Sequence, residues 1–157
     1  MSKLQALLKK AYEGKDIQKK VYGRFPFEIS SECGSEEVLE IILSLDRFQI
    51  EKRKVEEWDG DSKDDYWRLQ KNYSKLLALL TSKFPKEVIS GLKSDCMETR
   101  FWVAYALSES PTHKAVPAIK EYLESEMPKH HRSTAEKALM ACKAKVSFLG
   151  RIFGKNA

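Results

Sequence analysis

The residues best suited to hold a metal ion form a short acidic segment near the middle of the chain. Six carboxylates lie close together: Glu56, Glu57, Asp59, Asp61, Asp64 and Asp65. Carboxylate oxygens are ligands that Ca²⁺ and Mg²⁺ prefer, but the order of residues lacks the sixth-position glycine and twelfth-position glutamate of an EF-hand loop. We therefore expect a solvated acidic turn before a helix start, where acids are favoured. Trp58 and Trp67 flank this turn, so it would also suit a basic partner.

The histidines and cysteines do not form a catalytic or metal-binding pattern. His130 and His131 are adjacent and cannot both face one metal from a helix. Cys33, Cys96 and Cys142 are widely spaced, which favours reduced structural thiols over disulfides or a zinc site. Cys96 lies at an expected helix start, where a thiol pKa can fall, but no base lies near it in the sequence. Because phosphate-loop, hydrolase and zinc-protease motifs are also missing, we expect no catalytic residue, no metal and no cofactor.

Composition favours one folded domain over residues 1–157. The chain is 42% hydrophobic and 10% aromatic, which suits a packed core and excludes a disordered chain. No run of 18 apolar residues exists, so we expect no membrane span. The first residues lack a secretory signal pattern, and together these features indicate a cytoplasmic protein.

The formal net charge of +5 belongs to the two ends of the chain. Residues 1–24 carry +5 and residues 143–157 carry +4, which leaves −4 for residues 25–142. A nucleic-acid-binding domain usually has a basic stripe along its body, so this distribution makes a nucleic-acid partner unlikely. The apolar and basic tail, 146–157, could lie on an anionic membrane surface, but we favour a tail that caps the last helices.

One helical pattern occurs twice, thirty-two residues apart. Its first copy comprises Arg100, Val103, Ala106 and Leu107, and its second comprises Arg132, Ala135, Ala138 and Leu139. A shorter apolar helix precedes each copy, at 88–92 and at 116–123. Helix pairs repeated at such a period are typical of stacked solenoids. We therefore predict an all-α fold, a short α-solenoid of stacked helical hairpins with roughly seven or eight helices.

The repeat also divides the chain. Residues 85–145 should form two repeats, while residues 1–84 should form N-terminal helices that are degenerate repeats or a cap, because the pattern does not continue upstream. Apolar spacing predicts helices over about 3–13 and 62–82, and a last helix over about 129–145. Asp95 is the expected N-cap of the first long repeat helix.

The stretch 85–143 resembles the HEAT-like repeats of small bacterial proteins and phycobilisome-lyase-type proteins. The matching residues are Leu92-Lys93-Ser94-Asp95, Arg100 and Ala106-Leu107, then Leu123-Glu124-Ser125-Glu126, Arg132 and Ala138-Leu139. The resemblance implies that each Arg bonds an acid or carbonyl in the neighbouring turn, with Asp95 as the acid in the first copy. It also implies that each Ala-Leu pair packs between layers.

The resemblance further implies that the second helix of each repeat lines a concave surface. Two positions on that helix, directly after the Arg and five after it, would point to solvent. They hold Ser133 and Lys137 in the second copy but Phe101 and Tyr105 in the first, with Trp102 beside them. Residues spaced i, i+4 lie side by side on a helix, and exposed aromatic clusters are typical protein-binding anchors. The alternative is that an N-terminal segment or the loop at 25–27 covers them.

Three functions fit this pattern. The first is a non-catalytic protein-binding module, and the resemblance to small bacterial proteins implies an immunity protein that neutralises a cognate toxin domain. Its contact residues would be Phe101, Trp102, Tyr105, Arg100, Ser133, Lys137, Arg68 and Lys71. The second is nucleic-acid binding through the basic N-terminal segment, as in HEAT-like repair glycosylases, and the third is a lyase-like or chaperone-like accessory subunit. The oligomeric state is left open.

Overall fold

The computed structural model describes the backbone of residues 2–12, 29–55 and 60–153, and the side chains of residues 2–8, 10, 29–47 and 67–144. These ranges contain no strand. They form seven α-helices: α1 (Lys3–Tyr12), α3 (Ser35–Val55), α4 (Gly60–Leu80), α5 (Pro85–Ser90), α6 (Met97–Glu109), α7 (Val116–Leu123) and α8 (Lys129–Phe153). Three short 3₁₀ turns join them: η1 (Ser30–Glu32), η2 (Gly91–Lys93) and η3 (His113–Ala115). The predicted all-α fold is confirmed, and no helix in these ranges is both long and apolar enough to cross a membrane.

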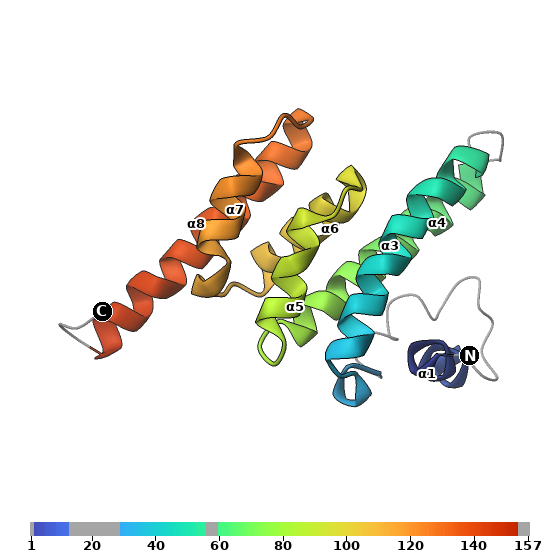
Figure 1. The fold of residues 1–157 in the computed structure, drawn as a ribbon, viewed down its shortest axis with the longest axis horizontal. Helices are drawn as coiled ribbons and strands as arrows, with labels where there is room; N and C mark the ends of the chain where they lie inside the picture. The colour runs from blue at the N-terminus through green and yellow to red at the C-terminus, as the bar shows by residue number, and fades with distance from the viewer. Residues whose placement is uncertain (1, 13–28, 56–59, 154–157) are drawn as a thin grey trace.

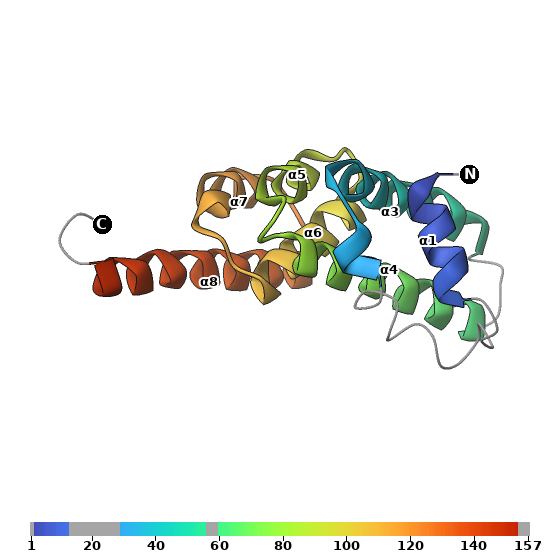
Figure 2. The ribbon, with the colours of Figure 1, turned by 90° about the horizontal axis from the view of Figure 1, so that it is seen from below.

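The helices after α1 follow one another along the chain as α3 and α4, α5 and α6, and α7 and α8 (Figure 1). α3 packs on α4 and α7 on α8, while in the middle pair η2, which continues α5, makes the contact with α6. Figure 2 shows that α3, α5 and α7 lie along one layer and α4, α6 and α8 along the other. In the second layer α4 packs on α6 and α6 packs on α8. The layer of α4, α6 and α8 therefore presents a row of three neighbouring helices. That these pairs form a HEAT-like solenoid stays a prediction.

The apolar positions that predicted the helices form the core between the two layers. Leu76, Leu77 and Leu80 of α4 are fully buried. The repeated alanines Ala106 and Ala138 are also fully buried, and their small side chains suit the close approach of α6 and α8. The sequence pattern therefore identified the helix faces that meet in the core.

Gly91 lets η2 pack tightly against its neighbours. A Cβ atom at this position would lie 2.5 Å from Val103 Cγ2 and 3.2 Å from Ile42 Cδ1. The first distance is far below van der Waals contact, so the backbone can approach α6 only where no side chain intervenes. Gly91 thus fixes the spacing between η2 and the helices beneath it.

Helix α1 is attached to the start of α3 by an ion pair as well as by apolar packing. Lys3 Nζ lies 3.0 Å from Glu37 Oε1, and Leu4 is 1% exposed. Burial acts to raise the pKa of Glu37, but hydrogen bonds from Lys3 and from backbone amides outweigh it, so the pKa of this carboxyl lies below its ordinary value. Lys3 has a raised pKa because it donates to Glu37.

The start of α6 differs from the sequence prediction. Asp95 was expected to cap this helix, but Cys96 is the N-cap residue and makes no side-chain cap bond. Asp46 of α3 organises the turn instead, since its Oδ1 accepts hydrogen bonds from Ser94 Oγ at 2.7 Å and Thr99 Oγ1 at 2.5 Å. Ser94 Oγ in turn accepts from the Cys96 backbone N–H. The prediction was wrong because the carboxylate comes from another helix.

The last helix is longer than the spacing of its apolar residues indicated. α8 continues to Phe153, whereas the prediction ended it near residue 145. Gly150 lies within it, and a single glycine costs only about 1 kcal/mol in a helix. The aromatic loop at 25–27, the side chains of the acidic segment and of the tail, and most of the basic N-terminal segment lie outside the described residues.

Candidate protein-binding surface

Aromatic and histidine rings form a continuous row across the layer of α4, α6 and α8. We call this row the aromatic strip; it comprises Trp67, Trp102, Phe101, Tyr105, His130 and His131. Trp67 of α4 lies 5.9 Å from Trp102 of α6, and Trp102 lies 5.0 Å from Phe101, between ring centroids. Phe101 stacks on His131 of α8 at 4.6 Å and meets His130 edge-on at 5.8 Å. The strip therefore links all three helices through ring contacts.

Trp102 is the buried support of the aromatic strip. It is 2% exposed, and its Nε1 donates a 2.7 Å hydrogen bond to Gln70 Oε1 of α4. The Trp102 carbonyl accepts a 2.6 Å bond from Ser74 Oγ, also of α4. Because a buried indole N–H normally needs a partner, these bonds fix the ring. Trp102 was expected to be an exposed anchor beside Phe101, but its ring is buried. It packs against the rings of Trp67, Phe101 and Tyr105 and does not face solvent.

The rings that reach solvent lie to either side of Trp102. Trp67 is 53% exposed and His130 is exposed, while Phe101 and Tyr105 are half-buried. The positions of Phe101 and Tyr105 were expected to point to solvent, and neighbouring rings cover part of each. Burial and a hydrogen bond with Glu109 raise the pKa of Tyr105, so its hydroxyl stays neutral at physiological pH.

The sequence analysis connected Trp67 with the acidic turn and a basic partner, and did not count it among the contact residues of this surface. The signal was present, because Trp67 lies outside the apolar period of α4 that includes Leu69, Tyr73 and Leu76. A large aromatic residue on the polar side of an amphipathic helix is a candidate for surface contact. Gln70 lies one turn after Trp67 and bonds to Trp102, so this polar side of α4 is the one that faces α6.

Basic side chains lie beside the exposed part of the aromatic strip. Lys71 Nζ stands 4.9 Å from the centroid of the Trp67 ring, a favourable cation–π distance. Arg68 is exposed on the same turn of α4. Lys137 and Ser133 are exposed on α8, and Lys137 follows His130 by two helical turns, on the same side. The structure thus brings most of the predicted contact residues to one layer, with cations at both ends.

The two repeat arginines behave differently from each other. Arg132 Nη1 donates to the Leu123 carbonyl at 3.1 Å and its Nη2 donates to the Ser125 carbonyl at 3.0 Å. This agrees with the expectation of an arginine that bonds carbonyls in the neighbouring turn. Arg100 instead has a buried Nε without a hydrogen-bond partner and lines a cavity against α7. Arg100 was expected among the contact residues, but it lies outside the ring contacts of the aromatic strip.

The aromatic strip offers exposed rings for contact with another molecule. Within the described residues, no three His, Cys, Asp or Glu side chains come together as a metal site would require. No protein-family model, curated protein or solved structure matches the chain. The resemblance to HEAT-like repeats therefore rests on the residue pattern alone.

Proposed function

We propose that this chain is a non-catalytic protein-binding module and that the aromatic strip is its contact surface. Within that role, the proposal is a bacterial immunity protein that binds and neutralises a cognate toxin domain in the cytosol. The observation that carries the proposal is the exposed Trp67 ring, which is supported by buried Trp102 and covered on one side by Lys71. Tryptophan in such a setting is the residue type most enriched among binding hot spots.

The charges around the aromatic strip indicate the chemistry of the partner surface. Lys71 lies beside the Trp67 ring, and Arg68 and Lys137 are exposed on the same layer, whereas Glu109 is bonded to Tyr105. We infer that the partner surface carries carboxylates around an apolar pocket for Trp67. Complementary charges raise the association rate and fix orientation more than they raise affinity. Association with the toxin domain should therefore slow as salt is added, because exposed charges are screened.

The test is protection of bacterial growth by co-expression. The proposal predicts that a gene adjacent to the one that encodes this chain encodes the toxin domain. That domain is co-expressed with wild type or with Trp67→Ala, and growth is measured. We expect wild type to restore growth and Trp67→Ala to bind about 30-fold more weakly, as for a hot spot of about 2 kcal/mol. The matched control is Leu43→Ala, because Leu43 of α3 is 55% exposed and Trp67 is 53% exposed.

Two results would contradict this proposal. If wild type neither restores growth nor binds the toxin domain, the immunity role is wrong. If binding occurs and Leu43→Ala weakens it while Trp67→Ala leaves it unchanged, the contact surface lies on the layer of α3 and not on the aromatic strip.

Nucleic-acid binding is the second candidate, and one observation favours it. An exposed tryptophan beside Lys71 and Arg68 is also a platform on which an unpaired base can stack. This candidate predicts that single-stranded oligonucleotides bind wild type, with an affinity that falls steeply as salt rises. It also predicts quenching of Trp67 fluorescence by the oligonucleotide, which the toxin-binding proposal does not require.

A further inference from the structure

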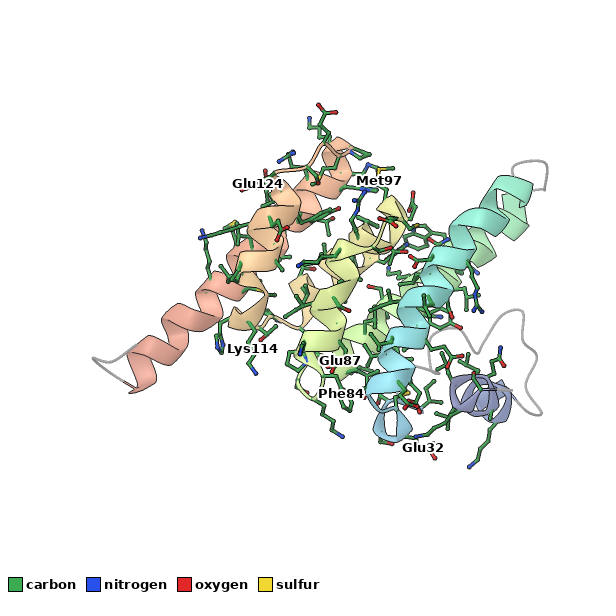
Figure 3. All side chains as sticks on the ribbon, in the orientation of Figure 1. Glu32, Phe84, Glu87, Met97, Lys114 and Glu124 are labelled. Carbon is green, nitrogen blue, oxygen red and sulfur yellow. The ribbon has the colours of Figure 1, made fainter. Side chains whose placement is uncertain are left out.

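A cavity separate from the aromatic strip lies between the second and third helix pairs. Its volume is about 360 Å³, and it is lined by Leu92, Lys93, Arg100, Ala118, Glu121, Tyr122 and Ser125. These residues come from η2, α6, α7 and the turn after α7. Figure 3 labels Glu124, which follows α7, and Met97, which begins α6, and so locates the ends of two helices that line the cavity. Since one water occupies about 30 Å³ of liquid, the cavity has room for a small organic molecule.

Two residues that line this cavity each carry a buried polar atom without a hydrogen-bond partner among the described residues. These atoms are Nε of Arg100 and the hydroxyl oxygen of Tyr122. Tyr122 is 5% exposed as a whole. Buried polar groups are almost always paired in folded proteins, and an unpaired one costs about 1–3 kcal/mol. Because both residues line one cavity, a ligand that reaches these two atoms would complete their bonding.

The repeated sequence supplies an internal comparison for Arg100. Arg132 occupies the equivalent repeat position, and its guanidinium Nη1 and Nη2 donate hydrogen bonds to the Leu123 and Ser125 carbonyls. Arg100 leaves its Nε–H without such a bond. The two Nη bonds hold the Arg132 guanidinium against the turn after α7, whereas no such carbonyl bond is made by the buried Nε of Arg100. Arg100 is therefore available to a bound group in a way that Arg132 is not.

The charges around the cavity favour a ligand with a single negative charge. Arg100, Arg132 and Glu98 lie near enough to influence the Tyr122 hydroxyl, and Lys93 and Glu121 are exposed residues of the lining. The three cations (Arg100, Arg132 and Lys93) exceed the two carboxylates (Glu98 and Glu121) by one positive charge. Burial raises the pKa of Tyr122, with the two arginines opposing it, so the hydroxyl keeps its proton and can donate.

We propose that this cavity binds the carboxylate of a small organic acid through Arg100 and Tyr122. One carboxylate oxygen accepts from Arg100 Nε–H and from the Tyr122 hydroxyl, and the hydrocarbon part contacts Leu92 and Ala118. Both donor atoms are closed to solvent in this structure. The proposal therefore requires the half-buried Arg100 side chain to rotate so that the carboxylate reaches them. This site is independent of the protein-binding proposal.

The test compares propionate with inorganic phosphate as probes of the full chain. The melting temperature is measured for wild type, Tyr122→Phe, Arg100→Gln and the control Tyr105→Phe, at fixed ionic strength. Tyr105 is a matched control because its hydroxyl is engaged with Glu109 away from the cavity. Direct binding of propionate is measured on the same proteins by ligand-observed NMR. We expect propionate to stabilise wild type and Tyr105→Phe saturably, and to bind Tyr122→Phe about 10- to 100-fold more weakly.

The free Tyr122→Phe protein supplies a second measurement. Because the hydroxyl has no partner in the structure, its removal should leave the melting temperature without ligand unchanged or raised. A lowered melting temperature would show that the hydroxyl is already paired and would overturn the proposal. Equal stabilisation of all four proteins by propionate would also overturn it, since that is a general salt effect. A cavity-dependent effect of phosphate without one of propionate would show that the ligand class is wrong.

Discussion

Replacement of Phe101 by alanine tests whether the Phe101 ring is half-buried and packs against the other rings of the aromatic strip. A fully buried phenylalanine costs about 3–5 kcal/mol when truncated to alanine. Phe101 is half-buried, so roughly half of that, about 2 kcal/mol, is expected. Its ring contacts with Trp102, His131 and His130 keep the cost well above zero, because each aromatic pair contributes about 0.5–1.5 kcal/mol beyond area burial.

The assay is urea unfolding, with the free energy of unfolding derived from the midpoint and slope. For a chain of this size, a loss of about 2 kcal/mol corresponds to a fall of roughly 4–8 °C in Tm. Lys137→Ala is the control, because Lys137 is exposed on α8 and such surface changes stay within about 0.5 kcal/mol. A cost for Phe101→Ala as small as this control, or as large as that of a fully buried ring, would refute the arrangement of the strip.

Three further predictions concern packing, an ion pair and cysteine exposure away from the aromatic strip. Gly91→Ala should destabilise the protein by about 1–3 kcal/mol in the same urea assay, because its Cβ would overlap a side chain of α6; an unchanged midpoint would contradict the close packing of η2. The lowered pKa of Glu37 means that its contribution to stability is present above about pH 4.5 and is lost as pH falls through the folded-state value. The pH dependence of Tm below pH 5 should therefore flatten in Lys3→Gln, and a parallel curve would argue against the pair. Thiol labelling of the native protein should modify half-buried Cys96 before Cys33, whose burial raises its pKa to about 11; preferential labelling of Cys33 would contradict its burial.

The sequence predicted the helices well wherever the apolar residues keep a helical period. The repeated pattern with Ala106 and Ala138 identified the faces on which α6 and α8 meet, because both alanines are fully buried. The helix limits were less accurate. The prediction ended α8 before Gly150, but the helix continues through that glycine to Phe153. Gly154 follows Phe153 directly and is the stronger stop signal in the sequence.

Features that depend on contacts between distant segments were not predictable. Asp46 lies 48 and 53 positions away from the two hydroxyls that it binds, so local spacing pointed to Asp95 as the cap. The sequence showed that Phe101 and Trp102 are adjacent. Consecutive helical residues point in directions about 100° apart, so the two rings cannot both face the same neighbour. Which of them is buried depends on where α4 packs, and the sequence does not show this. The cavity at Arg100 likewise depends on where α7 lies.

The central claim is that a protein partner covers the aromatic strip. The most direct test is hydroxyl-radical footprinting of the chain alone and in complex with the proposed partner, a toxin domain. Trp67 and His130 should lose reactivity in the complex, while Leu39 and Leu43, exposed on α3 in the other layer, should keep it. Unchanged reactivity of Trp67 together with protection of Leu39 and Leu43 would contradict the claim and move the contact surface to the opposite layer.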